Sequence, residues 1–172
     1  LRQIVSRHGT PAGAMAELNR ALSPDIRTGL YITMVYAVID VARNEVTFAR
    51  AGHELPLLVH RDLAHGGWRA DFVGSEGMAL GLVADGEFSP VLVERTEPFG
   101  PGDVLVLYTD GITEAPNEED KEFSGARLAD VVRMRRELSP REINGKIVEA
   151  VNRFTGDEPQ RDDFTLVTVK RV

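Results

Sequence analysis

Apolar residues recur at helical spacing near the start of the chain and at strand spacing soon afterwards. We predict a helix that begins at Pro11, because Thr10 is a typical N-cap residue and proline fits the first helical position. Met15, Leu18 and Leu22 then form one apolar side of this helix. We expect the helix to end soon after Leu22, where the sequence reads Ser-Pro-Asp.

Three strands are predicted to follow. Residues 30–40 and 45–51 are rich in β-branched and aromatic side chains, and only the four residues Val-Ala-Arg-Asn separate them. This short connection favours an antiparallel hairpin, and residues 56–60 resemble a third strand. Residues 61–88 are rich in glycine and weakly periodic, which indicates loops and short strands within the same domain.

The second half of the chain contains the most apolar strand. Residues 89–99 are expected to be extended, and a turn rich in proline and glycine leads from them into residues 104–108, Val-Leu-Val-Leu-Tyr. A nearly continuous apolar run of this kind is typical of a strand that is covered on both faces. Residues 164–172 are predicted to form the last strand.

Two helices are predicted between these strands. Residues 125–138 are expected to hold a shorter helix, and a longer one is expected over residues 139–154. Ser139, Pro140 and Glu142 make a capping-box start for the longer helix. Its apolar stripe consists of Ile143, Ile147, Val151 and Phe154.

The order of these elements predicts the fold class. Several consecutive strands followed by helices indicate an α+β architecture with mostly antiparallel sheets, because a parallel sheet would need a helix between successive strands. The length of 172 residues is that of one domain, so residues 1–172 are interpreted as a single unit.

Composition removes several classes of function. The net charge is −7 and no basic stripe is present, so nucleic acid is not an expected partner. The chain has no cysteine, which excludes thiolate metal sites and cysteine nucleophiles. No apolar run reaches the roughly 18 residues of a membrane span, so we expect no membrane insertion and take the cytoplasm as the default location.

Aspartates stand at the ends of two predicted strands. Asp110 and Gly111 follow residues 104–108, and Asp162 and Asp163 precede the last strand. If these two strands are antiparallel neighbours, the end of one and the start of the other lie at the same edge of the sheet. The carboxylates would then come together and form a site.

Such a site would favour a hard divalent cation. Converging aspartates repel one another, and oxygen ligands without cysteine suit Mg²⁺ or Mn²⁺, which can activate bound water or polarise a phosphoryl oxygen. Gly111 would let the backbone approach the ion or adopt a positive φ. The alternative is structural, because Asp-Gly is a common turn and paired aspartates often cap a loop.

Two further residues are weaker candidates. His53 is either a general acid or a hydrogen-bonded structural residue at a strand end. Glu114 is either a group that orients a metal-bound water or a partner of a backbone N–H. The acidic run at residues 118–122 is interpreted as a solvated loop.

Six segments of the sequence, taken together and in order, carry a resemblance to a known family. They read "TMVYAVID", "EVTFARAGHELPLLV", "MALGL", "GDVLVLYTDGITEA", "FSGARLADVV" and "RDDFTLVTVKR". Over residues 30–172 the chain resembles bacterial protein phosphatase 2C-like (PPM) serine/threonine phosphatases of the SpoIIE type.

The resemblance implies a fold and a reaction. The fold would be an α-β-β-α sandwich, two mostly antiparallel sheets flanked by helices, that holds two Mn²⁺ or Mg²⁺ ions. The reaction would be hydrolysis of phosphoserine or phosphothreonine on a STAS-type anti-sigma factor antagonist in bacterial signalling, under an upstream sensor domain in the same chain. Asp110, Gly111 and Asp162 match metal-binding positions, and the two aspartates would act through a metal-activated water. Asp163 occupies a neighbouring position, and His53 lies in a family signature, Ala-Gly-His.

One family motif is missing. The Asp-Val-x-Gly-His-Gly pattern, whose aspartate bridges the two metals, does not occur, and residues 6–13 contain His-Gly without a preceding aspartate. We therefore expect a domain that lacks its first strands, with a sheet edge that an upstream segment or a partner chain must cover. The alternative is a catalytically impaired pseudophosphatase that acts as a protein-binding or dimerisation module, including as a homodimer.

Overall fold

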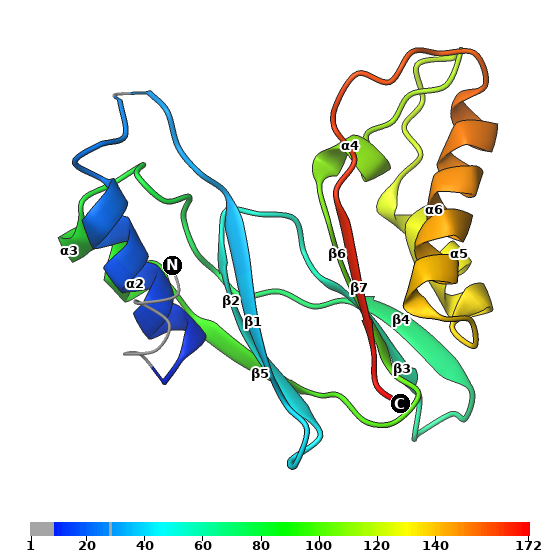
Figure 1. Ribbon diagram of the computed structural model, residues 1–172, viewed down its shortest axis with the longest axis horizontal. Coiled ribbons are helices and arrows are strands. Elements are labelled where there is room, and N and C mark those ends of the chain that lie inside the picture. The colour runs from blue at the N-terminus through cyan, green and yellow to red at the C-terminus, as the bar shows by residue number, and fades with distance from the viewer. Residues whose placement is uncertain (1–8, 28) are drawn as a thin grey trace. The chain divides into compact units, whose positions relative to one another are not determined.

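The computed structural model describes residues 9–27 and 29–172, and these residues group into two compact units (Figure 1). Unit 1 lies within residues 1–53 and 74–98, and unit 2 consists of residues 54–73 and 99–172. His8, in the stretch that contains His-Gly without a preceding aspartate, is outside the described residues. Each unit has its own antiparallel sheet and its own helices.

Unit 1 is a three-stranded sheet with the strand order β1-β2-β5. The predicted hairpin is confirmed, since β1 and β2 pair antiparallel from Met34 opposite Ala51 to Asp40 opposite Glu45. The elements of unit 1 are α2 (Pro11–Leu22), β1 (Met34–Asp40), β2 (Glu45–Ala51), α3 (Asp85–Phe88), the 3₁₀ helix η1 (Ser89–Val91) and β5 (Glu94–Pro98).

Helix α2 begins as its sequence predicts. The side chain of Thr10 accepts a hydrogen bond from the Gly13 N–H at 3.2 Å, and Pro11 occupies the first turn. Met15 is buried on the inner side of the helix. It packs with buried side chains of the strand β2 and of the glycine-rich segment, namely Ala49, Ala51, Leu80 and Phe88.

The first strand is shorter than predicted, because β1 starts at Met34 and not at residue 30. Ile32 instead pairs with Leu80, and the two residues exchange backbone hydrogen bonds of 2.9 and 2.8 Å. The segment 30–33 therefore leaves the β1–β2 ladder to contact the glycine-rich segment. This long-range pairing cannot be recognised from local periodicity.

Unit 2 is a four-stranded antiparallel sheet with the order β4-β3-β6-β7. Helix α5 packs against β3 and β4, and helix α6 packs against β7 and α5 (Figure 1). The elements of unit 2 are β3 (Leu57–Arg61), β4 (Trp68–Phe72), β6 (Val104–Tyr108), α4 (Asp110–Thr113), α5 (Gly125–Arg135), α6 (Pro140–Thr155) and β7 (Leu166–Lys170).

The core of unit 2 lies between its sheet and its helices. In β6 every residue except Leu107 is buried, which agrees with its continuous apolar run. Helix α6 begins with the predicted capping box, in which the Ser139 hydroxyl accepts from the Glu142 N–H and the Glu142 carboxylate accepts from the Ser139 N–H. The predicted stripe is buried at Ile143, Ile147 and Val151, and Phe154 is partly buried against the same core.

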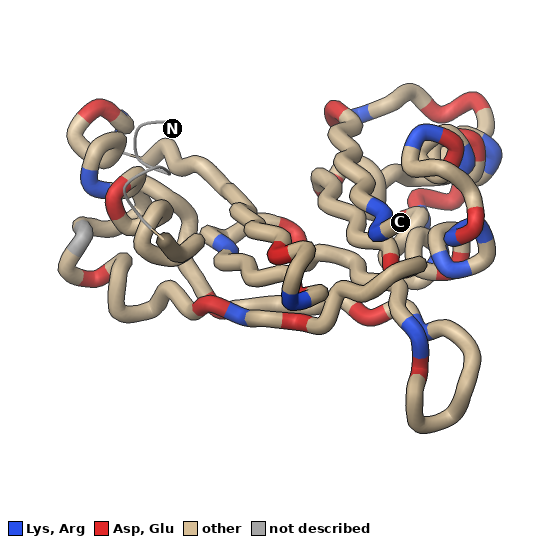
Figure 2. Tube along the Cα trace, turned by 60° about the horizontal axis from the view of Figure 1, so that its bottom comes forward, with Lys and Arg blue, Asp and Glu red and all other residues tan. Residues whose placement is uncertain are grey.

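The predicted α+β class with antiparallel sheets is confirmed. Over the described residues, Lys and Arg positions are interleaved with Asp and Glu positions and do not form one basic stripe (Figure 2). No helix in the described part of the chain is both long and apolar enough to cross a membrane.

Candidate metal and catalytic site

The two aspartate motifs meet at one end of the β6–β7 ladder. The ladder ends with Tyr108 opposite Leu166, so the chain leaves β6 where it enters β7. Thr109 continues the contact, since its N–H donates to the Thr165 carbonyl oxygen at 3.2 Å and its hydroxyl donates to the Asp163 carbonyl oxygen at 3.0 Å. The Thr165 N–H in turn donates to the Thr109 hydroxyl oxygen at 3.0 Å. These bonds fix the two motifs side by side.

Gly111 is required by this close approach. A Cβ atom at this position would lie 2.8 Å from the Asp163 carbonyl oxygen and 3.2 Å from the Cβ of Asp162. Gly111 is buried in the short helix α4, and its φ is outside the left-handed region, so of the two alternatives given for this glycine the positive φ is wrong. The residue is glycine because the backbone of the other motif occupies the place of a side chain.

Asp110 starts helix α4 with an exposed side chain. Its Oδ1 accepts a hydrogen bond from the Gly111 N–H at 2.9 Å, and its carbonyl oxygen accepts one from the Glu114 N–H at 2.8 Å. Asp162 and Asp163 are likewise exposed. The aspartates are therefore accessible to solvent, while the backbone that carries them is closely packed.

The electrostatics show that further carboxylates gather at this edge. Partial desolvation raises the pKa of Glu114, and the negative charges of Asp110, Glu122, Glu54 and Asp162 raise it further. Glu122 and Glu54 were not predicted as site residues. Glu122 belongs to an acidic run that looks like surface loop in the sequence, and Glu54 follows the Ala-Gly-His segment without a pattern of its own.

The oxygen donors at this edge are of the kind that binds a hard metal ion. Carboxylate and carbonyl oxygens are the ligands that Mg²⁺ and Mn²⁺ prefer. Within the described residues, however, no three His, Cys, Asp or Glu side chains converge closely enough to hold an ion. The chemistry of the donors suits a hard cation, whereas their number in the described part of the chain is too small for a complete centre.

His53 belongs to unit 1, whereas Asp110, Asp162 and Asp163 belong to unit 2. Its Nδ1 lies 3.1 Å from the Thr33 hydroxyl oxygen, and its carbonyl oxygen accepts from the Arg50 guanidinium at 2.6 Å. These contacts correspond to the structural interpretation of this histidine, as a hydrogen-bonded residue at the end of a strand.

A cavity of about 360 Å³ adjoins the aspartates within unit 2. It is bounded by α4, by the loop after α4, by the end of α6 and by the loop that leads into β7. Its lining residues are Gly111, Glu114, Ala115, Pro116, Glu122, Asn152, Thr155, Gly156, Glu158, Pro159, Gln160, Arg161, Asp162 and Phe164.

The fold is that of the PP2C-type phosphatase domains. The structure of the RsbU and RsbW domains of Rv1364c from Mycobacterium tuberculosis superposes with a TM-score of 0.76 at 26% identity, over 99% of this chain and 44% of that one. The SiaA PP2C domain of Pseudomonas aeruginosa superposes with a TM-score of 0.75 at 22% identity, over 98% of this chain and 65% of that one.

The family follows from the sequence. The model of the family described as stage II sporulation protein E (SpoIIE) matches residues 1–172, so the chain belongs to the SpoIIE family. The phosphoserine phosphatase RsbU of Bacillus subtilis is 25% identical over 161 residues, which is 94% of this chain and 45% of RsbU. The protein IcfG of Synechocystis is 24% identical over 83% of this chain and 21% of its own length. The chain thus spans less than half of either curated relative.

Proposed function

We propose that the protein is a metal-dependent phosphatase that hydrolyses phosphoserine or phosphothreonine on a regulatory protein. The observation that carries this proposal is the junction at the β6–β7 edge, where Asp110 and Gly111 lie against the backbone of Asp162 and Asp163. Membership of the SpoIIE family and the name of RsbU as a phosphoserine phosphatase support it.

The residues of this chain would have two roles, to hold the metal and to orient its ligands and water. Asp110, Asp162 and the backbone carbonyl of Gly111 would hold Mn²⁺ or Mg²⁺, with two ions expected in the complete centre. A bound ion supplies an activated water and neutralises charge on the phosphoryl group. Asp163 and Glu114 would orient the ligands and the water. Desolvation raises the pKa of Glu114, and the surrounding negative charges raise it further; a cation would relieve the effect of those charges.

The proposal also covers the substrate, the cellular location and the control of the phosphatase. A phosphorylated STAS-type regulatory protein in the bacterial cytoplasm is the proposed substrate, and an upstream sensor domain is the proposed source of control. One similar structure contains RsbU and RsbW domains of a single protein, Rv1364c, which supports a role in a signalling system with several domains.

Substitution of Asp110 tests the reaction directly. We expect Asp110→Asn in the full-length protein to reduce Mn²⁺-dependent hydrolysis of a phosphoserine peptide about a hundredfold or more, because a ligand of the ion would be lost. Asp130→Asn on α5 is the matched control, since Asp130 is an exposed partner of Arg133 and should not affect the rate. Equal activity of Asp110→Asn and wild type would overturn the assignment.

A pseudophosphatase is the second candidate. It is favoured by the absence of three converging ligands in the described part of the chain. Calorimetric titration with Mn²⁺ separates the two functions, because micromolar binding that Asp110→Asn abolishes would contradict a decayed site. Absence of both binding and hydrolysis would instead favour a module that binds a partner or a second copy.

A further inference from the structure

The cavity beside the aspartates has residues in common with the proposed reaction site. Gly111 and Asp162 belong both to the aspartate junction and to the cavity lining. Any group that occupied the cavity would therefore sit next to the phosphoryl group of a bound substrate. At about 360 Å³ the cavity is at the small end of ligand sites, and its volume suits a side chain rather than a whole domain.

The charge of the cavity is strongly negative. Four carboxylates line it, those of Glu114, Glu122, Glu158 and Asp162. Among the described lining residues Arg161 is the one cation, and its guanidinium lies 3.1 Å from the carboxylate of Asp120, which is outside the lining. The lining therefore attracts a cation from elsewhere.

The shape of the cavity favours an extended cation over a metal ion. No three of the described acidic side chains are close enough together to share an ion. The lining also contains apolar residues, namely Ala115, Pro116, Pro159 and Phe164. Lysine and arginine combine a charged end with an apolar stem, and such a side chain can contact spaced carboxylates and the apolar wall at once.

The walls of the cavity are held by hydrogen bonds. Pro116 pairs with Glu122 in an isolated antiparallel bridge, and between them the Asn117 side chain accepts from the Lys121 N–H at 2.9 Å. In the loop that leads into β7, the Gln160 side chain donates to the Asp162 carbonyl oxygen at 2.7 Å. These contacts fix the backbone that carries the acidic side chains, which lowers the cost of ordering them on binding.

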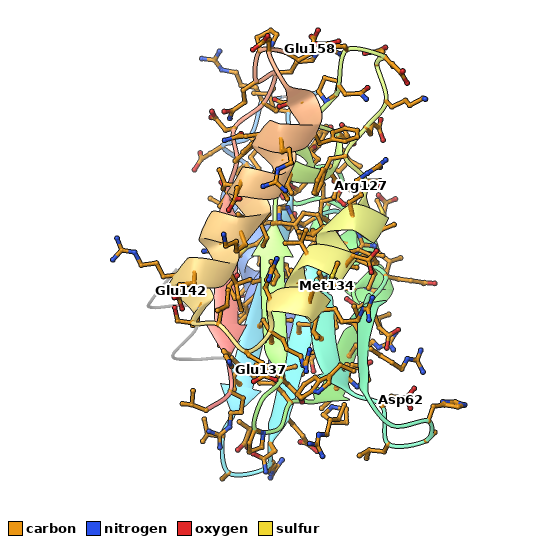
Figure 3. All side chains as sticks on the ribbon, turned by 90° about the vertical axis from the view of Figure 1, so that its right-hand side faces the viewer. Asp62, Arg127, Met134, Glu137, Glu142 and Glu158 are labelled. Carbon is orange, nitrogen blue, oxygen red and sulfur yellow. The ribbon has the colours of Figure 1, made fainter. Side chains whose placement is uncertain are left out.

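We propose that this cavity binds a lysine or arginine side chain close to the phosphorylated residue of the substrate, with Glu122 and Glu158 as the residues that select it. The inference rests on the proposed phosphatase function and adds a substrate class, a phosphopeptide with a basic residue at a fixed distance from the phosphoserine. Glu158 lies in the loop just after α6, at the opposite end of that helix from Glu142 (Figure 3). This end of α6 borders the cavity.

The test uses the full-length protein and a set of phosphoserine peptides in which one arginine is moved through each position around the phosphoserine. We expect one position to raise kcat/KM about tenfold over a peptide without arginine. Glu122→Gln and Glu158→Gln should each reduce that preference about fivefold, as for a partly exposed ion pair. Hydrolysis of para-nitrophenyl phosphate, which has no basic group, should be unchanged in Glu158→Gln.

Glu119→Gln is the matched control, because Glu119 lies in the same loop, pairs with Lys121 and does not line the cavity. A preference that does not depend on arginine position, or that Glu119→Gln reduces as much as Glu122→Gln does, would overturn the inference.

The experiment can distinguish failure of the proposed phosphatase activity from failure of the proposed binding of a basic side chain in the cavity. If no variant hydrolyses any substrate, the proposed function fails. Fluorescence anisotropy of labelled peptides then tests whether the cavity binds an arginine side chain. Tighter binding of one arginine peptide to wild type than to Glu122→Gln, weakened by salt, would support the cavity. Equal binding of all peptides would reject it.

Discussion

Both units join two distant sequence motifs through a glycine that has no room for a side chain. In unit 1 the Gly52 N–H donates to the Gly77 carbonyl oxygen at 3.2 Å, and a Cβ atom at Gly77 would collide with the Arg50 carbonyl oxygen. In unit 2 a Cβ atom at Gly111 would collide with the Asp163 carbonyl oxygen. The same packing device therefore connects two motifs in each unit.

The junctions differ in their charge. In unit 1 the Arg50 guanidinium donates to the carbonyl oxygens of Ser75 and His53, so a cation of the chain itself satisfies the backbone there. In unit 2 the neighbouring side chains are carboxylates, and their repulsion contributes to the raised pKa of Glu114. The junction in unit 1 is therefore neutralised by the chain itself, whereas the junction in unit 2 has negative charge for a cation to neutralise.

The largest effect is expected from Gly77→Ala. The new methyl group would meet backbone, which cannot move aside as a flexible side chain can, so we expect a loss of about 3 kcal/mol in the free energy of unfolding. Chemical denaturation measures this loss. If the junction of unit 1 is structural, Mn²⁺ affinity per folded molecule should stay unchanged. A selective loss of metal binding would contradict a purely structural role for this junction.

Gly111→Ala should affect activity more than stability. Displacement of Asp162 from Asp110 by about 1 Å would reduce phosphatase kcat about a hundredfold. Gly145→Ala in α6 is the matched control, because nothing lies within 4 Å of its Cβ position and alanine favours a helix interior. Full activity of Gly111→Ala would show that the close approach is not needed for the reaction.

Ser139→Ala should lower the stability of unit 2 at the start of α6, the end of that helix that is remote from the aspartates. Loss of the N-cap hydrogen bond should cost about 1 kcal/mol of stability. Thermal unfolding would measure the cost, and kcat measured well below the unfolding midpoint should remain that of wild type. A parallel fall in kcat would mean that general loosening of unit 2, and not the junction, explains the effect of Gly111→Ala.

The smallest effect is expected from Glu114→Gln without metal. Because the folded protein raises the pKa of Glu114 above its ordinary value of 4.5, the ionised side chain destabilises the folded state at neutral pH. The variant should therefore unfold at a slightly higher temperature than wild type at pH 7. The difference should shrink as the pH falls through the raised pKa towards 4.5 and below. If the variant is less stable than wild type at pH 7, the ionised Glu114 does not destabilise the folded state.

The sequence predicted that the two aspartate motifs meet on the condition that their strands are antiparallel neighbours, and the structure shows that pairing. The apolar runs that contain β6 and β7 are strong local signals, and antiparallel pairing then places Asp110 and Asp162 at one edge. The role of Gly111 as a metal-contacting backbone position stays a prediction. The physical reason for the glycine was not predicted, because the approach of the Asp163 backbone is a tertiary contact.

The sequence does not indicate which residues of the acidic run line the cavity. Glu119 and Glu122 stand in one acidic run, yet only Glu122 lines the cavity, because the Pro116–Glu122 bridge turns the loop there. Asn117, which stabilises this turn through its side chain, is the one local signal that was present. The start of β1 was missed for a similar reason, the pairing of Ile32 with Leu80.

The division of the chain into units has a consequence for its synthesis. The chain passes between the units at residues 53–54, 73–74 and 98–99, so neither unit is a continuous segment. During translation unit 1 lacks β5 until Pro98 has emerged, and β6 lacks its neighbour β7 until Lys170 has emerged. Pairings between segments so far apart form slowly. The aspartate junction is therefore among the last parts of the protein to form, and a nascent chain that stops before β7 cannot hold it.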